Sequence, residues 1–275
     1  MTALSLPTTG QPVDTETARE FMKETLNKVA REELEAIEAE LREKSRRMRA
    51  LLAPDNLPTL SDEHLTNLLR TVFATRRRAK DILQAVPPDD FRDAIARLLY
   101  GDTEVTIRFQ QFVDTMTGYI GDVRVLRPRK SSDSRAKQSA EDAALHDNLF
   151  CDLGSELLHF TNPDEYWLWT RWIWDPQAGT GAMPLVTNDG VDLLGNTVGE
   201  TYLKLGIATA FVKATGDAAG FFGGGPFGVD VFLVCVYAVY MYTTLRLRMT
   251  QEFNKVVPQL PELSRRLLGV WKMAI

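Results

Sequence analysis

The sequence predicts an all-α protein. It has a long N-terminal helix with a small helical bundle, then a C-terminal helical layer around a buried apolar helix, with a possible small β-hairpin as an excursion. Three observations lead to this fold class. Apolar residues recur at helical spacing in several segments. Proline, glycine and capping residues separate those segments. One apolar run near the C-terminus belongs to a stretch too long for a strand.

The composition is that of a globular protein. The chain has 275 residues, of which 44% are hydrophobic and 25% charged, enough for one large domain or two smaller ones. The formal net charge of -5 argues against a surface built wholly for nucleic acid, so such binding would have to be local. The start of the sequence has neither a basic nor an apolar signal region, so we expect a cytoplasmic protein.

Four segments are expected along the chain. They are a disordered leader over 1–13, an N-terminal helical subdomain over 14–118, a basic linker or loop over 119–138, and a C-terminal helical domain over 139–275. Cys151 and Cys235 are flanked by apolar residues and have no C-x-x-C partner. We therefore expect two reduced, buried thiols and no disulfide or zinc site.

The first helix is expected over 15–53 as one long element. Its apolar residues recur at helical spacing: Met22, Leu26, Val29, Ile37, Leu41, Met48 and Leu51. Three pairs four residues apart place the acid first, which is the better orientation: Glu38/Arg42, Glu40/Lys44 and Glu43/Arg47. A packed helix with a solvated charged face is favoured over a coiled-coil dimer, because Glu33 and Lys44 interrupt the seam.

Three further helices form the predicted small bundle. Ser61 caps the second helix, whose apolar face extends as far as Leu83. Pro88 opens the third, and Gly101 closes it. The fourth is expected to end at Gly118.

Two groups of basic residues could bind the phosphates of DNA or RNA. One lies on the predicted second helix and the other in the predicted linker: Arg76, Arg77, Arg78, Arg124, Arg127, Arg129 and Lys130. Arginine clusters are also common on solvated helix faces, and the overall charge is negative. Nucleic-acid binding is therefore an alternative rather than the main hypothesis.

A helix after Ser139 carries the candidate metal ligands. Asp152, Glu156 and His159 fall on one arc of that helix, with the E-x-x-H spacing that di-iron bundles use. A di-iron site also needs a second E-x-x-H and two further glutamates, and the sequence has no second E-x-x-H. We therefore favour a polar stripe with His159 hydrogen-bonded near the helix end, and expect no metal.

Four tryptophans within eight positions are expected on a short helix that begins at Pro163 and ends before Pro176: Trp167, Trp169, Trp172 and Trp174. Both faces of that helix would be apolar. Indole rings bury a large area with one polar atom to satisfy, so packing is favoured over an aromatic platform for a ligand or nucleobase.

The C-terminal part supplies the central helix. A hairpin is expected around 188–190, then a helix and a glycine-rich loop. That loop matches G-x-G-x-x-G over 223–228, but no strand leads into it and Pro226 lacks an amide donor, so a hinge is favoured over a dinucleotide site. The apolar run 231–242 is expected to be a core helix, with a membrane span as the alternative.

The functional hypothesis is a non-enzymatic helical adaptor or assembly factor that acts through protein–protein contacts. A protein partner or a homo-oligomer is expected, with no catalytic residues and no cofactor. The first alternative is a nucleic-acid-binding module that uses the two basic groups. The second is a metal-dependent enzyme with carboxylate and histidine ligands.

Overall fold

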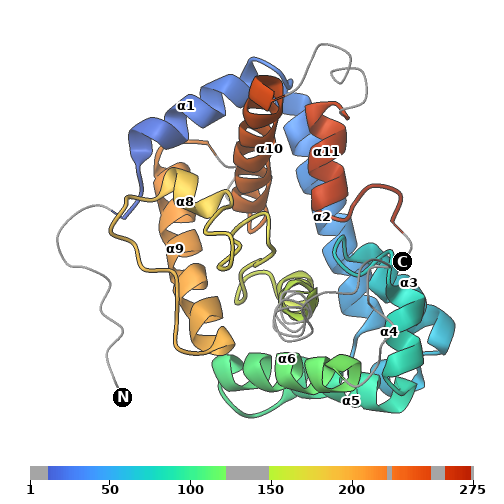
Figure 1. The fold of residues 1–275 in the computed structure, drawn as a ribbon. Coiled ribbons are helices and arrows are strands. Elements are labelled where there is room, and N and C mark those ends of the chain that lie inside the picture. Colours follow the sequence, from blue (N-terminus) through green and yellow to red (C-terminus); the bar gives the residue numbers. More distant parts are fainter. Residues whose placement is uncertain (1–11, 122–148, 222–224, 249–257, 274–275) are drawn as a thin grey trace. The chain divides into compact units, whose positions relative to one another are not determined.

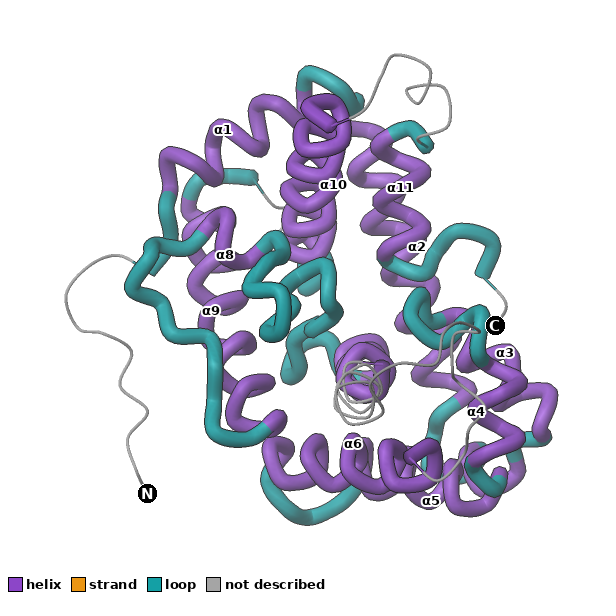
Figure 2. The backbone as a smooth tube through the Cα atoms, in the orientation of Figure 1, coloured by secondary structure: helices purple, strands orange, loops and turns teal. Residues whose placement is uncertain are grey.

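The computed structural model describes residues 12–121, 149–221, 225–248 and 258–273, and the regular elements in these ranges are helices (Figures 1 and 2). Within them no strand occurs, which confirms the all-α class. The helices are α1 (Thr15–Leu26), α2 (Arg31–Leu51), the 3-10 turn η1 (Leu57–Thr59), α3 (Asp62–Thr71), α4 (Ala79–Ala85), α5 (Pro88–Tyr100), α6 (Val105–Gly121), the helix 149–161, α8 (Met183–Val186), α9 (Val198–Ala218), α10 (Gly228–Arg248) and α11 (Leu260–Leu267).

The chain divides into two compact units. Unit 1 consists of residues 1–43, 170–194 and 203–271, and unit 2 of residues 44–169, 195–202 and 272–275. Helices α2 and α9 each contribute residues to both units. The expected leader 1–13 and linker 119–138 lie almost wholly outside the described residues, so those two assignments stay predictions.

Unit 1 is built around α10, which packs against α1 and α11 (Figure 1). Val229, Leu233 and Val236 are fully buried, as expected of a helix that is apolar on every side. The prediction of a helix over 231–242 is therefore confirmed. Among the residues that the structure describes, no helix combines the length and apolar character needed to cross a membrane.

The expected long helix over 15–53 is in fact two helices, so that prediction was wrong. Helix α1 ends at Leu26 and α2 begins at Arg31. The hydroxyl of Thr25 donates to the carbonyl of Phe21, and the amide of Val29 bonds back to Thr25. Threonine, asparagine and valine are weaker helix formers than leucine, lysine and glutamate, and Thr25, Asn27 and Val29 lie at the break.

No hairpin forms around 188–190 within the described part of the chain. The segment instead forms an isolated antiparallel bridge, Val13 with Thr187, next to the start of α1. The amide of Asp14 donates to the carbonyl of Val186 at 3.0 Å, and that of Asn188 donates to Pro12 at 3.1 Å. The predicted hairpin is therefore absent from the described residues, and the segment pairs instead with the residues before α1.

In unit 2, α5 packs against α6 and η1, and α3 packs against α4. The predicted second helix is interrupted, because α3 ends at Thr71 and α4 starts only at Ala79. In the intervening turn, the hydroxyl of Thr75 donates to the carbonyl of Leu69 at 2.5 Å, which satisfies an acceptor at the end of α3. Gly118 does not end α6, which continues to Gly121.

The tryptophan segment is not a helix, which corrects the prediction. A single turn at Asn162 gives way to irregular chain, since the amides of Glu165 and Tyr166 both bond to the carbonyl of Asn162. Side chains satisfy the backbone that follows: Ser155 accepts from the amide of Trp169, and Tyr202 donates to the carbonyl of Trp167 at 3.0 Å. These side-chain bonds replace helical ones.

The packing role of the indoles is confirmed for three of the four tryptophans. Trp169, Trp172 and Trp174 are buried, and Trp167 is half-buried. In unit 2, the ring of Trp169 lies 6.0 Å from that of Phe109. In unit 1, the ring of Trp172 lies 6.4 Å from that of Tyr237.

Candidate functional site

The three candidate metal ligands lie together in unit 2, on the helix 149–161, and all three are buried. Asp152 is 5% exposed, Glu156 2% and His159 0%. The helix is buried on every side from residue 149 to residue 160, and the spacing of the three residues places them on one arc of it. The question is whether their ligand atoms are available to an ion.

The carboxylate of Glu156 is already paired with a lysine. Its Oε2 lies 2.5 Å from Nζ of Lys44, which is itself fully buried and lies 4.0 Å from the centroid of the Phe160 ring. Burial raises the pKa of Glu156, while the charge and hydrogen bond of Lys44, the charge of His159 and a hydrogen bond from the backbone of Phe73 oppose that rise. Through these contacts, Glu156 on the helix 149–161 connects to Lys44 on α2 and to the backbone of Phe73 in the turn after α3.

His159 is oriented by a backbone contact. Its Nδ1 lies 2.7 Å from the carbonyl oxygen of Tyr166, and a carbonyl can only accept, so Nδ1 carries the proton. The arrangement matches the polar stripe that the sequence favoured, with His159 bonded near the helix end. Among the described residues, no group of three or more histidine, cysteine or acidic side chains is arranged to hold a metal ion.

The arginines predicted on the second helix lie in the turn between α3 and α4, so their helical placement was wrong. The guanidinium carbon of Arg76 lies 4.7 Å from the centroid of the Phe73 ring, and Arg77 is exposed. Arg78 is half-buried, and one of its terminal nitrogens has no hydrogen-bond partner among the described residues. The other basic candidates, Arg124, Arg127, Arg129 and Lys130, lie outside the described residues.

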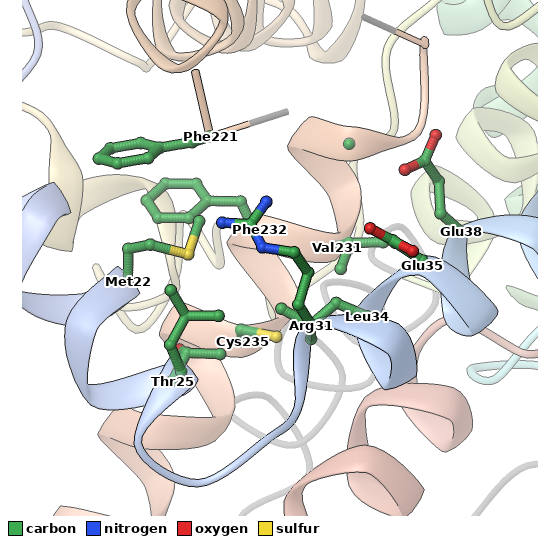
Figure 3. A pocket seen from close by; sticks show the side chains of 12 residues that line it. Met22, Thr25, Arg31, Leu34, Glu35, Glu38, Phe221, Val231, Phe232 and Cys235 are labelled. Carbon is green, nitrogen blue, oxygen red and sulfur yellow. The ribbon is translucent and has the colours of Figure 1, made fainter. Parts of the chain in front are cut away.

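A pocket in unit 1 was not predicted from the sequence. It has a volume of about 150 Å³ and opens between the end of α1, the start of α2 and the start of α10 (Figure 3). Its apolar lining consists of Met22, Leu26, Leu34, Phe221, Val231, Phe232 and Cys235. An apolar cavity of about 150 Å³ can hold a molecule of the size of benzene, so one bulky side chain would fit.

Charged side chains surround the mouth of this pocket. Figure 3 shows the guanidinium of Arg31 on the Phe232 side and the carboxylates of Glu35 and Glu38 on the other side. Glu38 is paired with Arg42 at 2.5 Å, as predicted. Glu40, which was predicted to pair with Lys44, binds Arg265, and Lys44 binds Glu156.

A larger apolar groove of about 570 Å³ lies along the other part of α1, also in unit 1. Its lining comes mainly from α1 and α9 and includes Ala18, Phe211, Ala214, Thr215 and Ala218. The pocket and the groove share the rings of Phe221 and Phe232. We call the pocket and the groove together the α1 surface.

One feature of the sequence could have indicated this surface. The α1 residues that line it fall on a single helical stripe: Thr15, Ala18, Arg19, Met22, Thr25 and Leu26. The sequence prediction assigned Met22 and Leu26 to the apolar face of one long helix. The break at Asn27 gives α1 its own direction, and Leu26 remains 39% exposed.

Comparison with known proteins gives no relative from which a function could be transferred: no family model matches the sequence, and neither a curated protein nor a solved structure is significantly similar to it.

Proposed function

We propose that this chain is a non-enzymatic adaptor or assembly factor, and that its α1 surface receives a segment of a partner protein. The observation that carries the proposal is the mainly apolar lining of two neighbouring hollows along α1, a pocket of about 150 Å³ and a groove of about 570 Å³. Grooves of this kind commonly receive the apolar face of an amphipathic helix.

The dimensions of α1 support a helical partner segment. With 12 residues, α1 is about 18 Å long at 1.5 Å per residue, so a helix of about three turns would cover it. Four of the α9 residues that line the groove lie on one face of that helix: Phe211, Ala214, Thr215 and Ala218. Three of these four side chains are small, which lets another helix approach closely.

Phe211 is the expected anchor on our side of the interface. Its ring lines the groove and is 41% exposed, whereas most large apolar side chains of the described residues are buried. An exposed ring within an apolar hollow is a common feature of interaction sites. The burial of this ring by a partner would contribute apolar contact area.

The experiment measures binding of two fluorescein-labelled amphipathic peptides of about 14 residues, long enough to cover α1. One has leucine on one face and lysine on the other, and the second has glutamate in place of lysine. We expect saturable one-to-one binding of at least one peptide in fluorescence anisotropy. Phe211→Ser should weaken it, whereas Leu194→Ser, at a 57% exposed residue of unit 1 outside both hollows, should not.

The adaptor proposal is contradicted if neither peptide binds, or if both serine variants change binding equally. Circular dichroism of each variant checks that the fold is retained. Phe211 and Leu194 are both exposed, so neither change should unfold the protein.

A second candidate function is nucleic-acid binding at the turn between α3 and α4. The observation that favours it is the guanidinium of Arg76 over the 37% exposed ring of Phe73, next to the exposed Arg77. An arginine beside an exposed ring can contact phosphate and stack on a base. Titration with single-stranded DNA and RNA at two salt concentrations tests this function, because phosphate binding must weaken steeply with salt.

A further inference from the structure

We propose that the partner segment is basic. One of its bulky apolar side chains fills the pocket of the α1 surface, and a lysine or arginine beside that side chain pairs with Glu35. This inference rests on the adaptor function proposed above and specifies the partner's chemistry.

The capacity of the pocket sets the apolar half of the motif. About 150 Å³ is room for one large aliphatic or aromatic side chain and not for two. Met22 lies at the wall, and the unbranched thioether of methionine adapts to different shapes. A single leucine, phenylalanine or tryptophan of the partner therefore suits this site.

Glu35 sets the charged half of the motif. Most of the other acidic side chains near it already have partners in unit 1: Glu38 pairs with Arg42, and Arg265 binds both Glu33 and Glu40. Glu35 lines the pocket, is exposed, and forms no ion pair with any residue that the structure describes. Its charge is thus available at the mouth of the pocket.

Arg31 does not neutralise Glu35, although the two are four residues apart on α2. A base that precedes the acid by four residues is in the less favourable order for a helical ion pair. In Figure 3 the guanidinium of Arg31 lies on the Phe232 side, away from the carboxylate of Glu35. The two ends of the mouth therefore carry opposite charges, and the cation of the partner belongs at the Glu35 end.

The chain segment that forms one wall of the pocket is also acidic in sequence. Residues 15–43, which contain α1 and the start of α2, have nine acidic side chains and five basic ones. An excess of negative charge attracts a basic segment and repels an acidic one, mainly through the association rate. The expected partner segment therefore has a positive net charge as well as an apolar anchor residue.

The experiment compares the leucine–lysine and leucine–glutamate peptides on the full chain and on two matched variants, Glu35→Gln and Glu32→Gln. Both residues are exposed on α2, but only Glu35 lines the pocket. We expect the leucine–lysine peptide to bind more tightly. Glu35→Gln should weaken it by about two- to fivefold, the range for an exposed ion pair, and Glu32→Gln by less. The difference should shrink at high salt.

A third variant tests the apolar half. Leu34→Trp places a larger side chain at the half-buried wall of the pocket, and we expect it to reduce binding of the leucine–lysine peptide while circular dichroism stays unchanged. Replacement of the central leucines of the peptide by alanine should have the same effect on the unmodified protein, without any change in the chain.

The outcomes separate the two proposals. Equal binding of both peptides, together with no effect of Glu35→Gln, overturns the basic partner and leaves the adaptor function in place. If the Leu34→Trp protein binds the leucine–lysine peptide as tightly as before, and the unmodified protein binds the alanine peptide equally well, only the claim that a side chain of the partner fills the pocket is overturned. The absence of binding by either peptide overturns the adaptor function and this inference with it.

Discussion

At the scale of single residues, the least predictable feature is the buried pair of Lys44 and Glu156. The sequence paired Lys44 with Glu40 and placed Glu156 among the metal candidates, because spacing within one helix says nothing about contacts 112 residues away. The role of each side chain depends on its neighbours in the folded protein, which the local sequence does not show. The local pattern did contain the pair Glu38/Arg42, which forms within one helix.

The first prediction concerns this pair. Lys44→Met leaves the carboxylate of Glu156 buried without its cation, so the free energy of unfolding at pH 7 should fall by about 3–5 kcal/mol. The double variant Lys44→Met, Glu156→Leu should recover most of that loss, because it removes both charges. Urea unfolding of the single and double variants measures both effects, and equal stability of the two variants would show that the pair is not coupled.

The pH dependence of Lys44→Met follows from the raised pKa of Glu156. Without Lys44, a favourable charge for the ionised carboxylate is lost, so the pKa in the folded state rises further above its ordinary value of 4.5. The folded state then binds the proton more tightly than the unfolded state, and stability falls as pH rises above 4.5 towards the folded pKa. The stability difference between the unmodified protein and the variant should therefore shrink as pH falls through 4.5 and be smallest below that pH.

Trp169 gives the second prediction. It is buried against the stacked rings of Phe109 and Tyr202, whose centroids lie 6.0 and 6.5 Å from its own. Trp169→Ala should therefore reduce the stability by about 3–5 kcal/mol, the range for a buried large aromatic. Trp167→Ala, at a half-buried position, should cost less. A melting temperature of Trp169→Ala equal to that of the unmodified protein would contradict the packing role.

At the scale of helices, existence was predicted better than continuity. The 88–100 and 231–242 segments are helical as expected, since their apolar residues and flanking prolines and glycines act locally. Breaks at 27–30 and 72–78 were missed, because no proline or glycine marks them. At both, a threonine hydroxyl bonds to a backbone carbonyl, and the sequence does not show when such a bond forms.

Two glycines in helices provide the third prediction. Gly118 lies within α6 with open space around its Cα, so Gly118→Ala should raise the stability by about 0.5–1 kcal/mol. Gly199 lies in the first turn of α9, where an added Cβ would clash with the backbone carbonyl of Thr106. Gly199→Ala should therefore destabilise unit 2 despite the same gain in helix propensity.

Thermal unfolding followed by circular dichroism distinguishes the two glycine variants. The account requires shifts of the melting temperature in opposite directions. Shifts in the same direction would mean that α9 does not approach Thr106 closely. The side chain of Gln110 already accepts from the amides of Val198 and Gly199 at this point, so the contact also positions the start of α9.

At the scale of the whole molecule, the sequence predicts the fold class but not how the chain is divided. Residues 1–43 belong to unit 1 with the C-terminal helices, and α2 and α9 both continue from one unit into the other. Periodicity identifies elements one at a time, so it cannot indicate that distant segments share a unit. The α1 surface was missed for the same reason, because α1, α2, α9 and α10 all contribute to it.

The central claim is that a basic amphipathic segment binds along α1. Hydrogen–deuterium exchange of the full chain, with and without the leucine–lysine peptide, tests it most directly because it locates the site without any substitution. We expect slower exchange confined to residues 15–38 of α1 and α2, and to 211–221 and 228–235 of α9, its following loop and α10. Protection only at the turn between α3 and α4, or no protection at saturating peptide, would contradict the claim.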